Sequence, residues 1–263
     1  MEKLISLDNV TKSYDGNCVL DHISHDFYAG ESVAFTGHNG CGKSTLLKIL
    51  AGLTSLSSGA VRCHKKIRFS FVPEKFPGMD IRMTDYLYAI AGMESVDTAV
   101  ADRLIKEFFL GSMARTRLNE LSKGSLQKVG VIQALIAPKE VLLLDEPLSG
   151  QDSASQDVFI QKINGLRKKG VTVFMSCHEK KLIDELSNHE YTISKGKLYL
   201  KDNGESDSLF KVFVRKREGL SPRAEMKDHG NRYLIEVKRG ELKETVLKLY
   251  DEGWELAGIE EHL

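Results

Sequence analysis

A cluster of three glycines, a lysine and two hydroxyl residues lies between two apolar segments near the start of the chain. Residues 37–45 read Gly-His-Asn-Gly-Cys-Gly-Lys-Ser-Thr, after the strand-like segment 32–36 and before 46–50, where leucines recur with helical spacing. Glycines at a strand-to-helix turn allow several backbone amides to point at one anion. The spacing G-x-x-x-x-G-K-S/T predicts a phosphate-binding loop in which Lys43 reaches the β and γ phosphates and Ser44 ligates Mg²⁺.

The whole loop is expected to contact a nucleotide. The predicted binding residues here are Gly37, Asn39, Gly40, Cys41, Gly42, Lys43, Ser44 and Thr45. The thiol of Cys41 is the unusual group, since converging amides, a helix N-terminus and the neighbouring Lys43 all favour a thiolate. The sequence therefore predicts that Cys41 is the most readily alkylated of the four cysteines. A small packed Cys41 whose sulfur points into the domain is the alternative.

Two acids end an apolar segment further along the chain. Residues 141–144 are Val-Leu-Leu-Leu, and Asp145 and Glu146 follow directly. A fully apolar strand is typical of the middle of a parallel sheet, whose carboxyl edge carries ligand-binding side chains. We expect Asp145 to hold Mg²⁺ and Glu146 to polarise the water that attacks the γ-phosphoryl group. A solvated strand end would be the better interpretation of an Asp-Glu pair that stood alone.

These side chains need a sheet to position them, and residues 1–203 have the pattern of one. Short apolar segments alternate with helical ones, which predicts an α/β domain with a mainly parallel central sheet and antiparallel strands at its N-terminus. The expected strands are 4–10, 19–27, 32–36, 67–72, 141–145, 171–176, 191–194 and 197–200. Residues 77–137 have helical periodicity instead, so we expect an inserted helical subdomain there. Its expected helices are 83–91, 96–110 and 126–137.

Residues 202–263 differ in pattern from the α/β domain that precedes them. Residues 202–208 are polar and turn-rich, which indicates a linker. Residues 209–263 are expected to form a small α/β accessory module, and they contain no ligand motif. Its expected elements are strands at 209–215, 232–238 and about 254–259, and a helix at 241–250.

Composition narrows the possible partners. The 37 basic and 37 acidic residues cancel, so nothing in the overall charge favours nucleic acid. The four cysteines form no C-x-x-C pair, which fits reduced thiols in a cytoplasm better than disulfides or zinc. No apolar segment approaches the roughly twenty residues that span a bilayer, and the first ten residues have no signal-peptide pattern. We expect a chain that is soluble by itself.

Residues 121–129 read Leu-Ser-Lys-Gly-Ser-Leu-Gln-Lys-Val, and they resemble the signature of the ABC-type ATPases, LSGGQ-x-QRV. The matching residues are Leu121, Ser122, Gly124, Gln127 and Val129, with Lys128 in place of the usual arginine. Lys123 and Ser125 depart from the pattern. The resemblance implies a head-to-tail dimer, a homodimer or a paired ABC ATPase, in which ATP lies between the phosphate loop of one copy and Ser122 and Gly124 of the other.

Other landmarks of the ABC-type ATPases follow in order and extend the resemblance over residues 4 to about 200. Tyr14 stands where these proteins stack an aromatic ring on adenine, although a purely structural tyrosine is the alternative. Residues 149–152, Ser-Gly-Gln-Asp, resemble the D-loop that contributes Asp152 to the nucleotide site, and His178 matches the switch histidine at the γ-phosphate.

One landmark of the ABC-type ATPases, the Q-loop, has a different residue in this chain. Residues 71–74, Phe-Val-Pro-Glu, occupy the place of the family's Q-loop, so Glu74 replaces a glutamine. Its carboxylate could reach Mg²⁺ or a bound water, and it adds negative charge near the γ-phosphate. A passive, solvent-facing Glu74 is the alternative.

The resemblance implies an ATP-binding and ATP-hydrolysing subunit of an ABC transporter, an exporter, that powers separate transmembrane permease subunits. Such a chain lies in the cytoplasm, peripherally at the inner face of the membrane. The permease is expected to contact a groove beside Glu74 that is lined by residues such as Phe76, Met79, Met83, Tyr86 and Tyr88. The alternative is that these side chains belong to the core. The transported substrate is not indicated by the sequence.

A second hypothesis is a soluble ABC ATPase of a cytosolic assembly. The iron–sulfur cluster-building type also has a single cassette and therefore stays open. The two cassettes of translation-type members and the long coiled coil of DNA-repair types do not occur in this sequence. A GTPase is set aside because no Asn-Lys-x-Asp base-reading motif is present.

Overall fold

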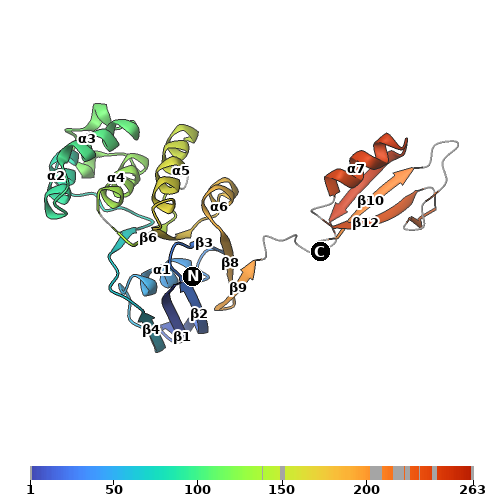
Figure 1. Ribbon diagram of the computed structural model, residues 1–263, viewed down its shortest axis with the longest axis horizontal. Coiled ribbons are helices and arrows are strands. Elements are labelled where there is room, and N and C mark those ends of the chain that lie inside the picture. Colours follow the sequence, from blue (N-terminus) through green and yellow to red (C-terminus); the bar gives the residue numbers. More distant parts are fainter. Residues whose placement is uncertain are drawn as a thin grey trace. The chain divides into compact units, whose positions relative to one another are not determined.

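The computed structural model forms two compact units that divide after Lys201 (Figure 1). The structure describes residues 2–137, 139–148, 152–201, 209–215, 222, 226–230, 232–238 and 242–261. The linker expected at 202–208 lies outside the described residues. Every residue expected at the nucleotide site belongs to the first unit.

A six-stranded sheet forms the centre of the first unit, in the order β5-β6-β7-β3-β8-β9. Its strands are β3 (Ser32–Thr36), β5 (Phe69–Val72), β6 (Val141–Asp145), β7 (Thr172–Ser176), β8 (His189–Ser194) and β9 (Lys197–Lys201). All neighbours are parallel except β8 and β9. Every residue of β6 and β7 is buried, because both faces of these strands are covered. The mainly parallel sheet predicted from the sequence is thus confirmed.

The two faces of this sheet bury alternate residues of the same strands. Leu143 and Phe174 pack in one core with residues of α1 (Lys43–Leu50). Leu142 and Leu144 pack in a second core with residues of α5 (Ser153–Arg167) and α6 (Lys180–Leu186). Figure 1 shows α1 on one side of the sheet and α5 and α6 on the other. The period-two alternation of each strand therefore fixes the helices on both sides.

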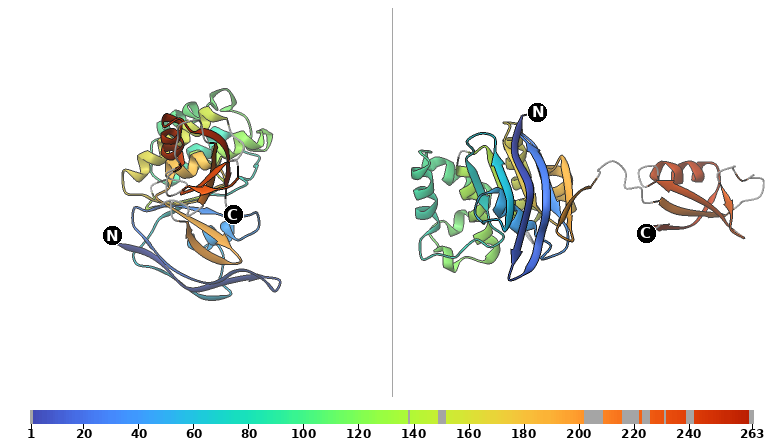
Figure 2. Two further views of the ribbon diagram at one scale, coloured as in Figure 1. Left: turned by 90° about the vertical axis from the view of Figure 1, so that its right-hand side faces the viewer. Right: turned by 90° about the horizontal axis from the view of Figure 1, so that it is seen from below.

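An antiparallel sheet of β1 (Lys3–Tyr14), β2 (Asn17–Tyr28) and β4 (Ser58–Cys63) completes the core on the α1 side. The long β1–β2 pair, in blue, is clearest in the right-hand view of Figure 2. Both strands are longer than predicted, and β4 is absent from the prediction. All six residues of β4 are exposed or half-buried, so it has no apolar alternation that the sequence could reveal.

The inserted helical subdomain follows β5 and ends before β6. Its helices are α2 (Met83–Met93), α3 (Thr98–Glu107) and α4 (Lys123–Ile136). The α4 helix begins three residues before the predicted start, because the Ser122 hydroxyl accepts a hydrogen bond from the Ser125 amide and caps it. Among the residues that the structure describes, none of the helices is both long and apolar enough to span a bilayer.

The residues expected to line a permease groove beside Glu74 fit the alternative that they belong to the core. Met83 is fully buried and Phe76 is 8% exposed, so both belong to the core of the unit. Met79, Tyr86 and Tyr88 are half-buried against the same core. Helical spacing marks an apolar face but cannot show whether that face meets solvent or its own domain.

The second unit is a four-stranded antiparallel sheet in the order β11-β12-β10-β13. Its elements are β10 (Leu209–Arg215), β11 (Lys227–Asp228), β12 (Tyr233–Lys238), α7 (Leu242–Asp251) and β13 (Glu255–Glu261). Val212, Ile235, Leu249 and Trp254 form its core, so α7 covers one face of the sheet. The short β11 was not predicted from the sequence.

Candidate functional site

A cavity of about 590 Å³ lies beside the carboxyl ends of β3 and β6. Its lining residues are Asn39, Gly40, Gly42, Lys43, Ser44, Glu74, Lys123, Gly124, Gln127, Glu146 and His178. These residues come from the phosphate-loop segment, the loop after β5, the start of α4 and the ends of β6 and β7. The volume is within the usual range for small-molecule sites.

The loop between β3 and α1 requires glycine at two positions. Gly37 has φ of +134°, and a Cβ atom there would lie 2.6 Å from the carbonyl oxygen of Ile193. Gly42 has φ of +111°, and a Cβ atom there would lie 2.8 Å from the side chain of Leu20. L-residues rarely adopt this backbone, so the two glycines allow the close turn that leads into the N-terminus of α1.

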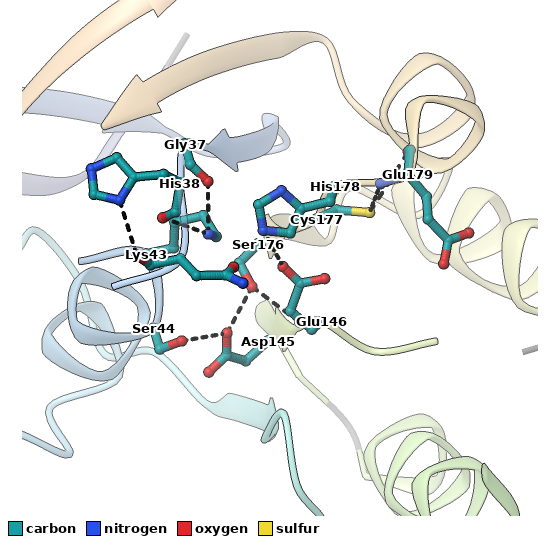
Figure 3. A network of polar contacts seen from close by, with 11 residues as sticks. Gly37, His38, Lys43, Ser44, Asp145, Glu146, Ser176, Cys177, His178 and Glu179 are labelled. Atoms are coloured by element: carbon teal, nitrogen blue, oxygen red, sulfur yellow. Dashed lines mark hydrogen bonds and ion pairs between the residues drawn. The ribbon is translucent and has the colours of Figure 1, made fainter. Parts of the chain in front are cut away.

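Lys43 is the first residue of α1 and is 7% exposed. Its Nζ donates hydrogen bonds to the carbonyl oxygens of Gly37 at 2.9 Å and His38 at 3.3 Å (Figure 3). The ammonium group is therefore held over the loop whose amides would bind phosphate. A buried cation at a helix N-terminus suits a polyphosphate ligand.

Asp145 joins the phosphate loop to the neighbouring strands. It is 2% exposed, and its Oδ1 accepts hydrogen bonds from Ser44 Oγ at 2.9 Å and Ser176 Oγ at 2.7 Å (Figure 3). A hydroxyl and a carboxylate oxygen side by side are the hard oxygen donors that Mg²⁺ prefers, so this pair fits the ion. Ser176 was not identified from the sequence, where a serine ending a buried strand gives no distinctive signal.

Glu146 and His178 lie in contact in the lining of the cavity. Glu146 has φ of +47°, and its amide donates to Ser176 Oγ at 3.0 Å, which turns the side chain away from β6. Its Oε1 is buried, lies 3.2 Å from His178 Nε2 and accepts no hydrogen bond from any residue that the structure describes. Burial is the largest effect on Glu146 and raises its pKa. The charges of His178 and Lys43 lower this pKa, and those of Asp145 and Glu74 raise it. A more basic carboxylate is suited to accept a proton from water.

Six of the predicted nucleotide contacts lie outside the cavity lining, namely Tyr14, Gly37, Cys41, Thr45, Ser122 and Asp152. Tyr14 is 44% exposed, with Lys12 Nζ 4.7 Å from its ring centroid, so its ring is accessible to a base. Thr45 is half-buried within α1. Cys41 is only 6% exposed, and a Cβ atom on Gly37 would lie 2.7 Å from its sulfur. The burial of Cys41 fits the alternative of a packed cysteine and not a readily alkylated thiol.

Ser122 and Asp152 have clear structural roles as helix caps. Ser122 caps α4, and Gly124 lies in the first turn of that helix and lines the cavity. Asp152 caps α5, where its carboxylate accepts the Ser155 amide at 2.8 Å and lies 3.3 Å from Lys128 Nζ. Neither Ser122 nor Asp152 lines the cavity of its own chain. D-loop residues 149–151 lie outside the described residues.

Gln127 and Lys123 also line the cavity, although neither was predicted as a site residue. Gln127 Nε2 donates to the carbonyl oxygen of Pro73 at 2.8 Å, and its Oε1 accepts the Phe76 amide at 3.3 Å. Gln127 thus fastens the loop that carries Glu74 to α4. The sequence shows Gln127 as part of a motif but not which loop it contacts.

A glycine-rich loop that holds a buried lysine, beside a strand-end acid pair, defines a P-loop nucleoside triphosphatase. The family model described as ABC transporter matches residues 20–149. An uncharacterized ABC transporter ATP-binding protein of Methanocaldococcus jannaschii is 34% identical over 75% of this chain and 76% of its own length. The chain therefore belongs to the ABC transporter family, as an ATP-binding subunit.

Relatives with assigned roles differ in what they transport. A zinc import ATP-binding protein of Vibrio vulnificus is 33% identical over 70% of both chains. A lantibiotic transport ATP-binding protein of Streptococcus pyogenes is 27% identical over 80% of this chain and 96% of its own. Among solved structures, a dimeric ATP-binding cassette bound to ADP and phosphate has a TM-score of 0.67 at 21% identity, covering 74% of this chain and 96% of that one. That similarity shows the ABC ATPase fold.

Proposed function

We propose that the chain binds Mg²⁺ and ATP in this cavity and hydrolyses the ATP between two head-to-tail copies. The observation that carries the proposal is the set of contacts that joins Ser44, Asp145 and Ser176 directly beside the Glu146–His178 pair. In the proposed dimer, Ser122 and Gly124 of one copy approach the γ-phosphate held by the other. Tyr14 stacks on adenine, and Asp152 contributes from the D-loop of the neighbouring copy.

We assign one or more residues of the cavity to each step of hydrolysis. Lys43 Nζ offsets the charge of the β and γ phosphates, and the amides of residues 39–45 surround them. The Glu146 carboxylate accepts a proton from water as the oxygen attacks the γ-phosphorus and the bond to the β–γ bridging oxygen breaks. His178 positions the γ-phosphate from the opposite side. Ser44, Asp145 and a water at Glu74 would hold Mg²⁺, which would supply positive charge beside the phosphates.

We further propose that hydrolysis drives a transporter whose permease subunits are separate membrane-spanning chains, with this subunit at the cytoplasmic face. Membership of the ABC transporter family supports this coupling. We propose export as the direction, on the resemblance of Pro73-Glu74 and Leu121–Gly124 to exporter ATPases. The name of the lantibiotic transport relative gives no direction and the zinc import relative has the opposite one, so the choice of export rests on that resemblance alone.

The test is co-purification of the tagged full chain from its native membranes in mild detergent. Recovery of a polytopic membrane protein that stimulates ATP hydrolysis at least several-fold supports the proposal. A purely soluble complex, such as one that builds iron–sulfur clusters, would contradict it. With the recovered permease in vesicles and ATP on the ATPase side, export removes substrate from that side, whereas import delivers substrate to it.

A further inference from the structure

Ser176 is a buried hydroxyl residue at the end of β7, beside the two acids that end β6. Its exposed fraction is 0%, and it pairs with Asp145 across the parallel strands. Figure 3 shows its hydroxyl linked to both Asp145 and Glu146. A buried polar group is nearly always hydrogen-bonded, so the partners of this hydroxyl indicate what it holds in place.

The Ser176 hydroxyl makes two different kinds of hydrogen bond. Its single hydrogen is donated to Asp145 Oδ1 at 2.7 Å, and a lone pair of the same oxygen accepts the Glu146 amide at 3.0 Å. Asp145 Oδ1 also accepts the hydroxyl of Ser44 at 2.9 Å. One oxygen atom therefore connects the carboxylate expected to hold the metal with the backbone of the expected general base.

The backbone of Glu146 depends on this contact. Its φ of +47° lies in the left-handed region that residues other than glycine seldom adopt. The Glu146 amide is shared between the hydroxyl and the backbone carbonyl oxygen of Ser176, the latter at 3.2 Å. Without the hydroxyl, only the carbonyl oxygen would hold the amide. The Glu146 side chain, whose Oε1 lies 3.2 Å from His178 Nε2, would then be less firmly aimed.

We propose that Ser176 is a positioning residue for ATP hydrolysis, which fixes the Asp145 carboxylate and aims the Glu146 carboxylate at the attacking water. Ser176 is not among the residues that line the cavity, so it acts through the two acids and not by touching the nucleotide. Its removal should therefore slow the chemical step and leave ATP binding intact. The inference rests on the proposed function and deepens it.

The experiment measures hydrolysis at saturating Mg²⁺ and ATP, and the Kd for ATP without divalent cations. Ser176→Ala should lower kcat about 10- to 100-fold, the loss expected when a reacting group is displaced by about 1 Å, and should change Kd less than about two-fold. Added to Glu146→Gln, the same change should lower hydrolysis by less than about two-fold more, because residues that act through one another are not additive.

Ser70→Ala is the matched control. Ser70 is a buried serine of the same sheet whose hydroxyl donates to the Ala134 carbonyl oxygen at 3.3 Å, so its removal should leave kcat within about two-fold. Ser176→Cys keeps the size of the side chain with a weaker donor and should lower kcat at least about three-fold, which provides the measurement if Ser176→Ala does not fold.

Two results would overturn the inference. One is a normal kcat in whichever folded Ser176 variant is measured. The other is a loss of the same factor with and without Glu146→Gln, which would show that Ser176 acts on the fold in general and not through Glu146. Failure of the wild type to hydrolyse ATP would instead contradict the proposed function.

Discussion

Lys43 is the residue that we expect to offset most of the phosphate charge in the proposed site. Its Nζ lies 2.9 Å from the Gly37 carbonyl oxygen, and it is the buried cation of the phosphate loop. We predict that Lys43→Ala weakens nucleotide affinity at least about 100-fold, since it removes a charge-assisted contact to two phosphates. Isothermal titration with ATP measures this. Lys48→Ala, an exposed lysine of the same helix, is the control and should bind normally.

Glu146 is predicted to act on the chemical step and not on binding. Glu146→Gln keeps the size of the side chain but removes the proton acceptor, so steady-state hydrolysis should fall about 10²- to 10⁴-fold. Affinity for ATP should change less than about three-fold. Glu120→Gln, an exposed acid outside the cavity, serves as the control. Near-normal hydrolysis by Glu146→Gln would remove the assignment of the general base.

The cysteines offer a residue-scale test of the loop geometry. Cys18 and Cys63 are exposed, whereas Cys41 and Cys177 are buried. Burial raises the pKa of the Cys177 thiol to about 12, so it stays protonated at pH 8. Maleimide at pH 8 should therefore label Cys18 and Cys63 well before the other two, as read by peptide mapping. Preferential labelling of Cys41 would show instead that the thiol in the phosphate loop is reactive.

At the scale of elements, Asp152 begins α5 and joins it to α4. Its carboxylate accepts the amide and hydroxyl of Ser155 and contacts Lys128, and these interactions lower its pKa from 3.8 to about 2. We predict that Asp152→Ala lowers the free energy of unfolding by about 1 kcal/mol at pH 7, the usual loss for a helix cap. Urea unfolding measures the change.

The same contact predicts a pH dependence with a definite sign. Because folding lowers the pKa of Asp152, its stabilisation is complete above pH 4 and disappears as the pH falls towards 2. The difference between the wild type and Asp152→Ala should shrink accordingly in acid. Asp157→Ala, which removes an exposed ion pair with Lys181, should change stability by less than about 0.5 kcal/mol at either pH. An equal loss of unfolding free energy in Asp152→Ala and Asp157→Ala would contradict the capping role of Asp152.

Elements that bury one or both faces could be predicted from the sequence, and those that bury little could not. The apolar strands β3, β6 and β7 and the helix after the phosphate loop follow from periodicity alone. The exposed strand β4 does not, because its pairing with β1 depends on backbone hydrogen bonds that any sequence can make. The caps at Ser122 and Asp152 were likewise visible only as parts of motifs.

At the scale of the whole molecule, the site assembles from segments far apart in sequence. The order of parallel strands brings Ser44 to Asp145, and that juxtaposition could be predicted from the strand-end rule. The contacts of Gln127 with Pro73 and Phe76 could not, since they depend on how the helical subdomain packs against the sheet. Motif spacing therefore predicts which residues act, and packing decides which loops they touch.

Closure of two copies around ATP is the central feature of the proposed function. The mass of Glu146→Gln in solution, measured by light scattering with and without Mg²⁺ and ATP, tests this, because slow hydrolysis should let the closed form accumulate. We predict a mass twice the 29.4 kDa of one chain with Mg²⁺ and ATP, and a single copy with Mg²⁺ and ADP. The further change Ser122→Arg should abolish the dimer while ATP still binds. A variant that saturates with ATP yet stays a single copy at every concentration would contradict the account.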